Sequence, residues 1–235
     1  MVPPSIAYQA VPVAEGQGLS LLLPDAELVW HPSIMPAELN DRAFKFLLAN
    51  PTHPPQTTNW AGISDEEFAA IGFDHIAWQR QSGHFYGKTL QLPRLTAWYG
   101  EGHTVYSYSG ITSYPQPFNA GLSYLKRAVE TLSGCRFNSV LLNWYRDGED
   151  HMSWHADDEP ELGPSPVIAS LSFGAPRDFL IRRKDDHTHK ITLPLGHGSL
   201  LVMRGAMQRY WQHAVPKRRG VKGSRVNLTF RYIYT

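Results

Sequence analysis

Apolar positions follow helical spacing in the first part of the chain. Over residues 36–50 they recur three or four positions apart, and Pro51 ends the run, which predicts a helix. The same period returns over residues 118–132, where Asn119 is placed to cap the start and Gly134 to end the helix. Residues 1–20 have no clear period, so we expect a loose tail there.

From about residue 137 the pattern changes to short apolar runs separated by turn residues. The runs cover residues 139–145, 167–173, 179–183, 190–195, 199–203, 209–213 and 225–234. Many short strands at this spacing predict a sandwich or barrel. We therefore expect a mainly β (α+β) fold with one domain over residues 21–235. Its β core would occupy residues 136–235, with helices and loops over residues 21–135 in front.

Composition narrows the class of protein. Hydrophobic residues make up 42% of the 235 positions, which is enough to bury a core. The net charge is +1, with 22 basic and 21 acidic residues, so the overall charge does not indicate a nucleic-acid binder. Cys135 is the single cysteine, which fits a reducing compartment. No signal-peptide pattern or membrane-length apolar run is present, and we expect a cytoplasmic monomer without membrane contact.

Three residues form a candidate metal site. His155 and Asp157 are two positions apart, which places both on one face of an extended strand, and His213 ends a later run. Two histidines and one carboxylate are the ligand set of non-haem iron(II) oxygenases, and zinc with a bound water is the alternative. By itself this spacing is also compatible with a polar turn and a half-buried histidine.

The last predicted strand has two different faces. One face is apolar and is expected in the core: Val226, Leu228, Phe230 and Tyr232. The other face is polar: Arg225, Asn227, Thr229 and Arg231. If this polar face lines a barrel interior, its guanidinium groups require anions. The two arginines would hold opposite ends of a small dicarboxylate, or Arg231 would pair with a protein acid.

A similar polar face occurs over residues 139–145, where Leu141, Asn143 and Tyr145 lie together. The amide and the phenol can add hydrogen bonds to the same ligand. A dicarboxylate cosubstrate favours iron over zinc.

Five ordered motifs carry a family resemblance. NWYRDGEDHMSWHADDEPEL, SLSFGAPRDFLIRRK, LPLGHGSLLVM, WQHAVP and RVNLTFRYI together resemble the AlkB family of 2-oxoglutarate/iron(II) dioxygenases, in particular its branch that repairs alkylated DNA. The resemblance extends over residues 22–234. It implies a double-stranded β-helix (jelly-roll) core, N-terminal helices and a nucleotide-recognition lid within residues 21–135.

The resemblance also assigns ligands. It implies that His155, Asp157 and His213 bind Fe(II) and act in catalysis. The residues implied to contact or enclose 2-oxoglutarate are Asn143, Tyr145, Arg225, Asn227 and Arg231. Oxygen would be the third reactant, and oxidation of an N-methyl group would release formaldehyde and succinate.

Substrate contacts are expected around a flipped base. The resemblance implies that FYGK at 85–88 is the loop that probes the duplex, in which Tyr86 would enter the gap left by that base, with Gly87 in the same loop and Lys88 near phosphate. Tyr106 and Tyr108 share a strand face suited to stacking, and Arg94 is expected near the pocket or the DNA backbone. The carboxylate of Asp158 would favour a cationic base such as N1-methyladenine or N3-methylcytosine.

The expected partner is DNA with alkylated bases, single- or double-stranded. Basic groups over residues 182–184 and 217–222 are candidates for phosphate contact. The alternatives are the same chemistry on RNA, protein or a small molecule, a zinc hydrolase, and a nucleic-acid-binding module without activity. The compartment would be the cytoplasm, with association to the nucleoid in a bacterium, or the nucleus in a eukaryote.

Overall fold

The structure is a computed structural model. It describes residues 9–13, 18–48, 76–80, 82–85, 88–102, 104, 106–108 and 111–234. In the sequence, Ser64 and Glu67 have the spacing of a capping box, which predicts a short helix there, but these residues lie outside the described ones. No helix in the described part of the chain has the length and apolar character needed to cross a bilayer.

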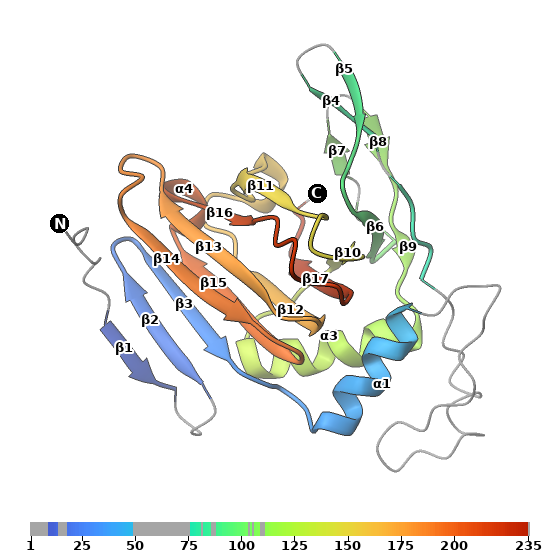
Figure 1. The fold of residues 1–235 in the computed structure, drawn as a ribbon, viewed down its shortest axis with the longest axis horizontal. Helices are drawn as coiled ribbons and strands as arrows, with labels where there is room; N and C mark the ends of the chain where they lie inside the picture. The colour runs from blue at the N-terminus through green and yellow to red at the C-terminus, as the bar shows by residue number, and fades with distance from the viewer. Residues whose placement is uncertain are drawn as a thin grey trace.

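Two antiparallel sheets form the body of the molecule (Figure 1). The larger has the order β1 (Gln9–Pro12), β2 (Leu19–Leu23), β3 (Ala26–His31), β15 (Ser199–Gly205), β12 (Ile168–Gly174), β17 (Arg225–Arg231), β10 (Ser139–Tyr145), β6 (Leu95–Gly100) and β9 (Gln116–Pro117), with only the β6–β9 pair parallel. The smaller has the order β11 (Met152–His155), β16 (Trp211–Val215), β13 (Arg177–Arg183) and β14 (Lys190–Leu195). The fold is the expected jelly roll.

Two helices, α1 (Ala37–Leu48) and α3 (Ala120–Ser133), cover the outer face of the larger sheet (Figure 1). Leu47 of α1 and Leu125 of α3 are fully buried with Leu228 of β17 in one apolar cluster. A second cluster fills the space between the sheets and includes Ile181 of β13 and Leu201 of β15. The central strands are therefore buried on both faces, and polar residues on the inner face lie inside the molecule.

Two hairpins extend beyond the sheets (Figure 1). One consists of β4 (Ser82–Phe85) and β5 (Lys88–Gln91), and the other of β7 (Tyr106–Tyr108) and β8 (Ile111–Ser113). They come from the part of the chain in which the nucleotide-recognition lid is expected.

The helix predictions are confirmed. Asn119 caps α3 by accepting a hydrogen bond from the backbone N–H of Leu122, and Gly134 ends the helix with φ 64°. Helix capping is local, because a side chain near the start bonds the free backbone N–H groups and a residue with positive φ ends the helix. The sequence can therefore predict both ends.

Three expectations differ from the structure. Residues 9–12 of the expected tail form β1, which pairs with β2 at the sheet edge and has every side chain exposed, so it has no alternation to detect. The run 209–213 starts in the short helix α4 (Met207–Tyr210), and β16 begins only at Trp211. Tyr232 is 41% exposed rather than in the core, because β17 ends at Arg231.

A short 3-10 turn, η1 (Pro160–Leu162), follows β11 in the chain.

Gly174 ends β12 at a position that only glycine fits. Its φ is +86°, and an added Cβ would lie 2.3 Å from the backbone oxygen of Ser224 and 2.5 Å from the ring of Phe44. We expect Gly174→Ala to lower the free energy of unfolding by about 3 kcal/mol, from backbone strain and overpacking together. Urea unfolding measures this, with Gly196→Ala as the control, since a Cβ there meets nothing within 4 Å. Equal losses in both variants would contradict this account.

Candidate metal and cosubstrate site

The three predicted metal ligands meet at the end of the smaller sheet. His155 is the last residue of β11 and is paired in register with His213 of β16, and Asp157 follows two residues after β11. One donor atom from each of the three residues lies within 4.8 Å of the other two. The ring centroids of the two histidines are 4.2 Å apart, and Phe179 stacks on His213. This is a compact set of two nitrogens and one oxygen with a buried apolar wall.

The protonation states suit a divalent metal. His155 Nδ1 is 2.8 Å from the backbone oxygen of Ser153, which leaves Nε2 with its lone pair when Nδ1 carries the proton. Burial lowers the pKa of His213 to about 3, with a further contribution from His155, so this ring is neutral at physiological pH. Burial opposes ionisation of Asp157, but Arg231 and the two histidines lower its pKa below the usual value. Imidazole nitrogens and a carboxylate oxygen are donors that Fe(II) accepts.

Asp157 is held from two sides. Its backbone N–H donates to the side-chain oxygen of buried Gln208 at 3.0 Å, and Arg231 Nη2 donates to its Oδ1. Arg231 thus pairs with a protein acid, which was one of the two alternatives for this residue. A contact between Arg231 and 2-oxoglutarate stays a prediction. Gln208 was not found from the sequence, because it lies in α4, 51 residues from Asp157, and no local pattern connects the two.

Arg225 forms a separate cationic site between the sheets. The side chain is 2% exposed, and its Nη2 donates to Ser172 at 2.9 Å. Its Nε and Nη1 have no hydrogen-bond partner among the residues that the structure describes. Its guanidinium lies 5.1 Å from the ring centroid of Tyr145. Burial lowers the pKa of Arg225 to about 10, so the group still carries its charge at neutral pH. A buried guanidinium with two free donor atoms and no carboxylate is suited to one carboxylate of 2-oxoglutarate.

The amide residues of this face lie opposite each other, since Asn143 of β10 pairs in register with Asn227 of β17. Asn227 Nδ2 donates to Ser170 and to the backbone oxygen of Leu171, and its Oδ1 accepts from Thr229. These bonds make Asn227 part of the wall of the site. Its contact with the cosubstrate stays a prediction.

Arg94 lies deeper than a DNA-backbone contact would require. It is 7% exposed, and its Nε donates to Asn143 Oδ1 at 2.7 Å. The residue precedes β6 and so connects the segment of the lid hairpins to the predicted cosubstrate residues. Its substrate role stays a prediction, as does that of Asp158, which is exposed beside the ligands.

The other substrate predictions fall largely outside the described residues. Tyr86 and Gly87 are outside them, and Lys88, Tyr106 and Tyr108 are described only as backbone positions in β5 and β7. The structure describes the two basic loops, and most of their basic side chains form ion pairs with acidic residues. Arg183 pairs with Asp25 and Asp185, Lys184 with Asp158, Arg218 with Asp178, and both Lys217 and Arg219 with Glu149.

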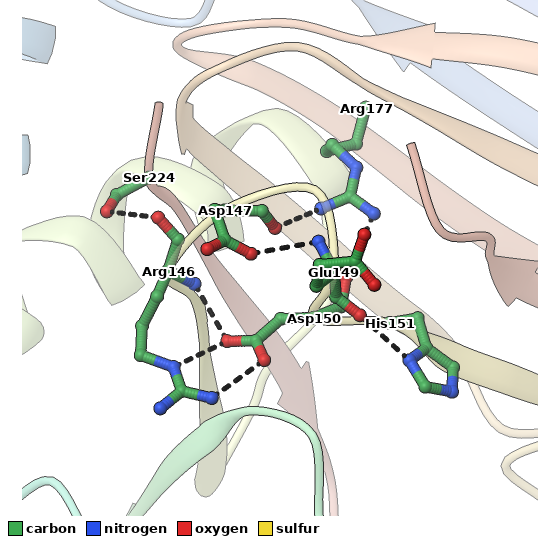
Figure 2. Close-up of polar contacts among 7 residues, drawn as sticks. All are labelled: Arg146, Asp147, Glu149, Asp150, His151, Arg177 and Ser224. Carbon is green, nitrogen blue, oxygen red and sulfur yellow. Dashed lines mark hydrogen bonds and ion pairs between the residues drawn. The ribbon is translucent and has the colours of Figure 1, made fainter. Parts of the chain in front are cut away.

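Arg177 is a further buried arginine of the site that the sequence did not indicate. It is 3% exposed, and its guanidinium donates to the backbone oxygens of Asp147 and Asp150 at 3.0 and 2.9 Å (Figure 2). It also donates to the backbone oxygen of Pro216 at 2.6 Å. These acceptors belong to the loop between β10 and β11 and to the residue after β16. Arg177 therefore ties together the loops beside Tyr145 and His213.

A carboxylate supports the same loop from the other side. Asp150 accepts from the backbone N–H, Nε and Nη2 of Arg146, and Ser224 Oγ donates to the backbone oxygen of Arg146 (Figure 2). Burial opposes ionisation of Asp150, but these hydrogen bonds from Arg146 lower its pKa overall. The loop that joins β10 to β11 is thus held by hydrogen bonds from several sides.

We expect Arg177→Met to lower the free energy of unfolding by about 3–5 kcal/mol, because three backbone oxygens lose a charged donor. Metal affinity should fall as well, since the loop that leads to His155 loosens. Urea unfolding and metal titration measure the two effects. Arg219→Met, on an 88% exposed side chain, is the matched control and should change neither. A stable Arg177→Met protein with unchanged metal affinity would contradict this role.

The jelly roll with a His, Asp, His donor set and a buried free guanidinium defines a class of iron- and oxoacid-dependent oxygenases. The chain belongs to the 2OG-Fe(II) oxygenase superfamily, whose family model matches residues 55–231. Members of this superfamily use Fe(II), 2-oxoglutarate and O2, and the described residues fit them.

Relatives place the chain within that superfamily and confirm the resemblance to the AlkB family. The human alpha-ketoglutarate-dependent dioxygenase alkB homolog 3 is 48% identical over 168 residues, which are 68% of this chain and 58% of that protein. Human DNA oxidative demethylase ALKBH2 is 44% identical over 155 residues, which are 63% of this chain and 59% of that protein. In both cases the match spans less than two thirds of the relative's length.

A solved structure titled OsALKBH1 supports the fold. Its TM-score is 0.56 at 16% sequence identity, and the match covers 90% of this chain and 98% of that chain. At this identity the comparison establishes the architecture, and the chemistry depends on the residues described above.

Proposed function

We propose that the protein is an Fe(II)- and 2-oxoglutarate-dependent dioxygenase that demethylates N-alkylated bases in DNA, with N1-methyladenine and N3-methylcytosine as substrates. One observation carries the proposal: Arg225, which is buried and has no carboxylate partner among the described residues, lies on the same inward face of β17 as Arg231, which pairs with the candidate metal ligand Asp157. A zinc hydrolase with the same three ligands would not require a buried guanidinium that binds an anion.

Each residue has a distinct task in this proposal. His155, Asp157 and His213 hold the iron, and Arg231 and Gln208 orient the carboxylate of Asp157. Arg225 and Tyr145 bind one carboxylate of 2-oxoglutarate, whose negative charge offsets the buried guanidinium. When bound, iron with 2-oxoglutarate and oxygen supplies the oxidant that hydroxylates an N-methyl group and leaves succinate and carbon dioxide.

The chain also has to shield this chemistry from water. Buried Phe179 stacks on His213 at a centroid distance of 5.1 Å, and the packed space between the sheets excludes solvent on that side. The hydroxymethylated base then loses formaldehyde and is restored. DNA as the substrate is supported by the similarity to human ALKBH2, which is named a DNA oxidative demethylase. The compartment and the monomeric state stay predictions.

The test is single-turnover demethylation. The protein is loaded anaerobically with Fe(II) and 2-oxoglutarate, mixed with a 3-methylcytosine oligonucleotide, and exposed to oxygen. We expect stoichiometric formaldehyde and succinate, and no product from His155→Ala. Methylated RNA, double-stranded DNA and a methylated peptide run in parallel would identify a different substrate. Turnover without 2-oxoglutarate or oxygen would instead indicate a zinc hydrolase.

A further inference from the structure

The carboxylate proposed to attract the cationic base is already paired with a cation. Asp158 Oδ2 lies 3.0 Å from Lys184 Nζ, and the two side chains are 59% and 31% exposed. Asp158 directly follows the metal ligand Asp157, so the pair lies beside the candidate iron site. Before substrate binds, the charge of Asp158 is therefore offset by an ammonium group of the same chain.

Lys184 is fixed more firmly than an ordinary surface lysine. Its Nζ also donates to the backbone oxygen of Gln208 at 2.9 Å, and its backbone N–H donates to the oxygen of Tyr210 at 2.9 Å. Both acceptors belong to α4, the helix that leads into the strand of His213. The ammonium is thus held by Asp158 and by the backbone oxygen of Gln208, whereas the neighbouring Arg183 pairs with Asp25 and Asp185.

A cationic base entering the site would meet a neutral pair rather than a free carboxylate. N3-methylcytosine and N1-methyladenine carry a positive charge, whereas an etheno-bridged adenine is neutral. An unpaired Asp158 would strongly favour the cationic bases, and the nearby ammonium both offsets that attraction and repels a cation. The charge of Lys184 therefore decreases the difference in affinity between cationic and neutral lesions.

We propose that Lys184 is a specificity-determining residue that broadens the lesion range by restraining the preference of Asp158 for cationic bases. The inference rests on the proposed function, because it assumes that Asp158 faces the alkylated base. One unit charge acting over several ångströms in a largely hydrated site corresponds to a change in relative affinity of about three- to tenfold.

The test compares two oligonucleotides of the same length that differ only in the lesion at one position. One carries N3-methylcytosine there and the other an etheno-bridged adenine. Binding to Lys184→Met and to the wild-type protein is measured by fluorescence anisotropy under anaerobic conditions. We expect the ratio of the two dissociation constants to shift about three- to tenfold in favour of the cationic base. The loss of one protein cation also weakens binding to both oligonucleotides equally. This general loss of affinity cancels in the ratio of the two dissociation constants.

Two controls make the result specific. Lys190→Met removes the same charge from an exposed position at the start of β14 and should leave the ratio unchanged. Adding Asp158→Asn to Lys184→Met should remove the gained preference, since the carboxylate is its source. Lys184→Arg keeps the charge and should resemble the wild-type protein.

Other outcomes would overturn the inference. An unchanged ratio in Lys184→Met, with both oligonucleotides bound less tightly and a weaker salt dependence, would make Lys184 a phosphate contact. An equal shift in Lys190→Met would mean that only net charge matters. If the wild-type protein does not demethylate the N3-methylcytosine oligonucleotide, the proposed function itself fails. If it demethylates that oligonucleotide while the binding ratio stays constant, only the role of Lys184 fails.

Discussion

Replacement of Asp157 by alanine is expected to lower affinity for Fe(II) by roughly a thousandfold or more and to abolish turnover. Asp157 is the one anionic ligand of the set, and its removal leaves the Arg231 guanidinium beside the two histidines. The cation would then repel a divalent metal from the remaining donors. Anaerobic metal titration by calorimetry measures the affinity, and succinate release measures turnover.

His187→Ala is the matched control for this variant. His187 lies in the exposed turn between β13 and β14 and does not belong to the His155, Asp157 and His213 cluster. Its removal should leave metal affinity and turnover unchanged. Retained tight metal binding in Asp157→Ala would disprove the ligand assignment, and equal losses in both variants would point to a site elsewhere.

Replacement of Arg225 by methionine is expected to have two opposite effects. Without cosubstrate, the variant should be about 1–3 kcal/mol more stable than the wild-type protein, because an uncompensated buried cation is replaced by an apolar side chain of similar length. Binding of 2-oxoglutarate should weaken at least about a hundredfold, because one carboxylate loses its charged partner. A purely structural arginine would give the reverse result for stability.

Thermal unfolding with and without 2-oxoglutarate separates these effects, since a ligand stabilises only the protein that binds it. The wild-type protein should gain stability with 2-oxoglutarate, and Arg225→Met should not. Arg219→Met, on an exposed loop, should respond like the wild-type protein. A full response in Arg225→Met would place the cosubstrate elsewhere, and Arg231, with its unpaired buried Nε, would be the next residue to replace.

For the metal ligands the sequence supplied only candidates, since Asp157 lies two residues beyond the end of β11 and His213 meets His155 through the pairing of β11 with β16. The arginine face was predictable because the alternation from Arg225 to Arg231 follows from the period of a strand. The structure places these side chains inward, as that period predicts, with Val226 and Leu228 packed against the helices. The ends of α3 were predictable for the same reason, because capping involves neighbours in sequence.

Other features of the site depend on residues that are distant in sequence. Arg177 looks like one more basic residue in a charged stretch until the fold brings the backbone oxygens of Asp150 and Pro216 to its guanidinium. Gln208 and Lys184 likewise gain their roles only through α4. The strand β1 was missed because an exposed edge strand has no buried face and so no alternation.

The sequence by itself determined which residue types can bind iron and a dicarboxylate, since their spacing and the period of a strand place them on common faces. It left open whether Arg231 binds cosubstrate or a protein acid, and whether Asp158 carries a free charge. Only the tertiary structure decided that Arg231 pairs with Asp157 and that Lys184 pairs with Asp158. The physical reason is that an ion pair depends on distances across the fold, and strand periodicity carries no information about them.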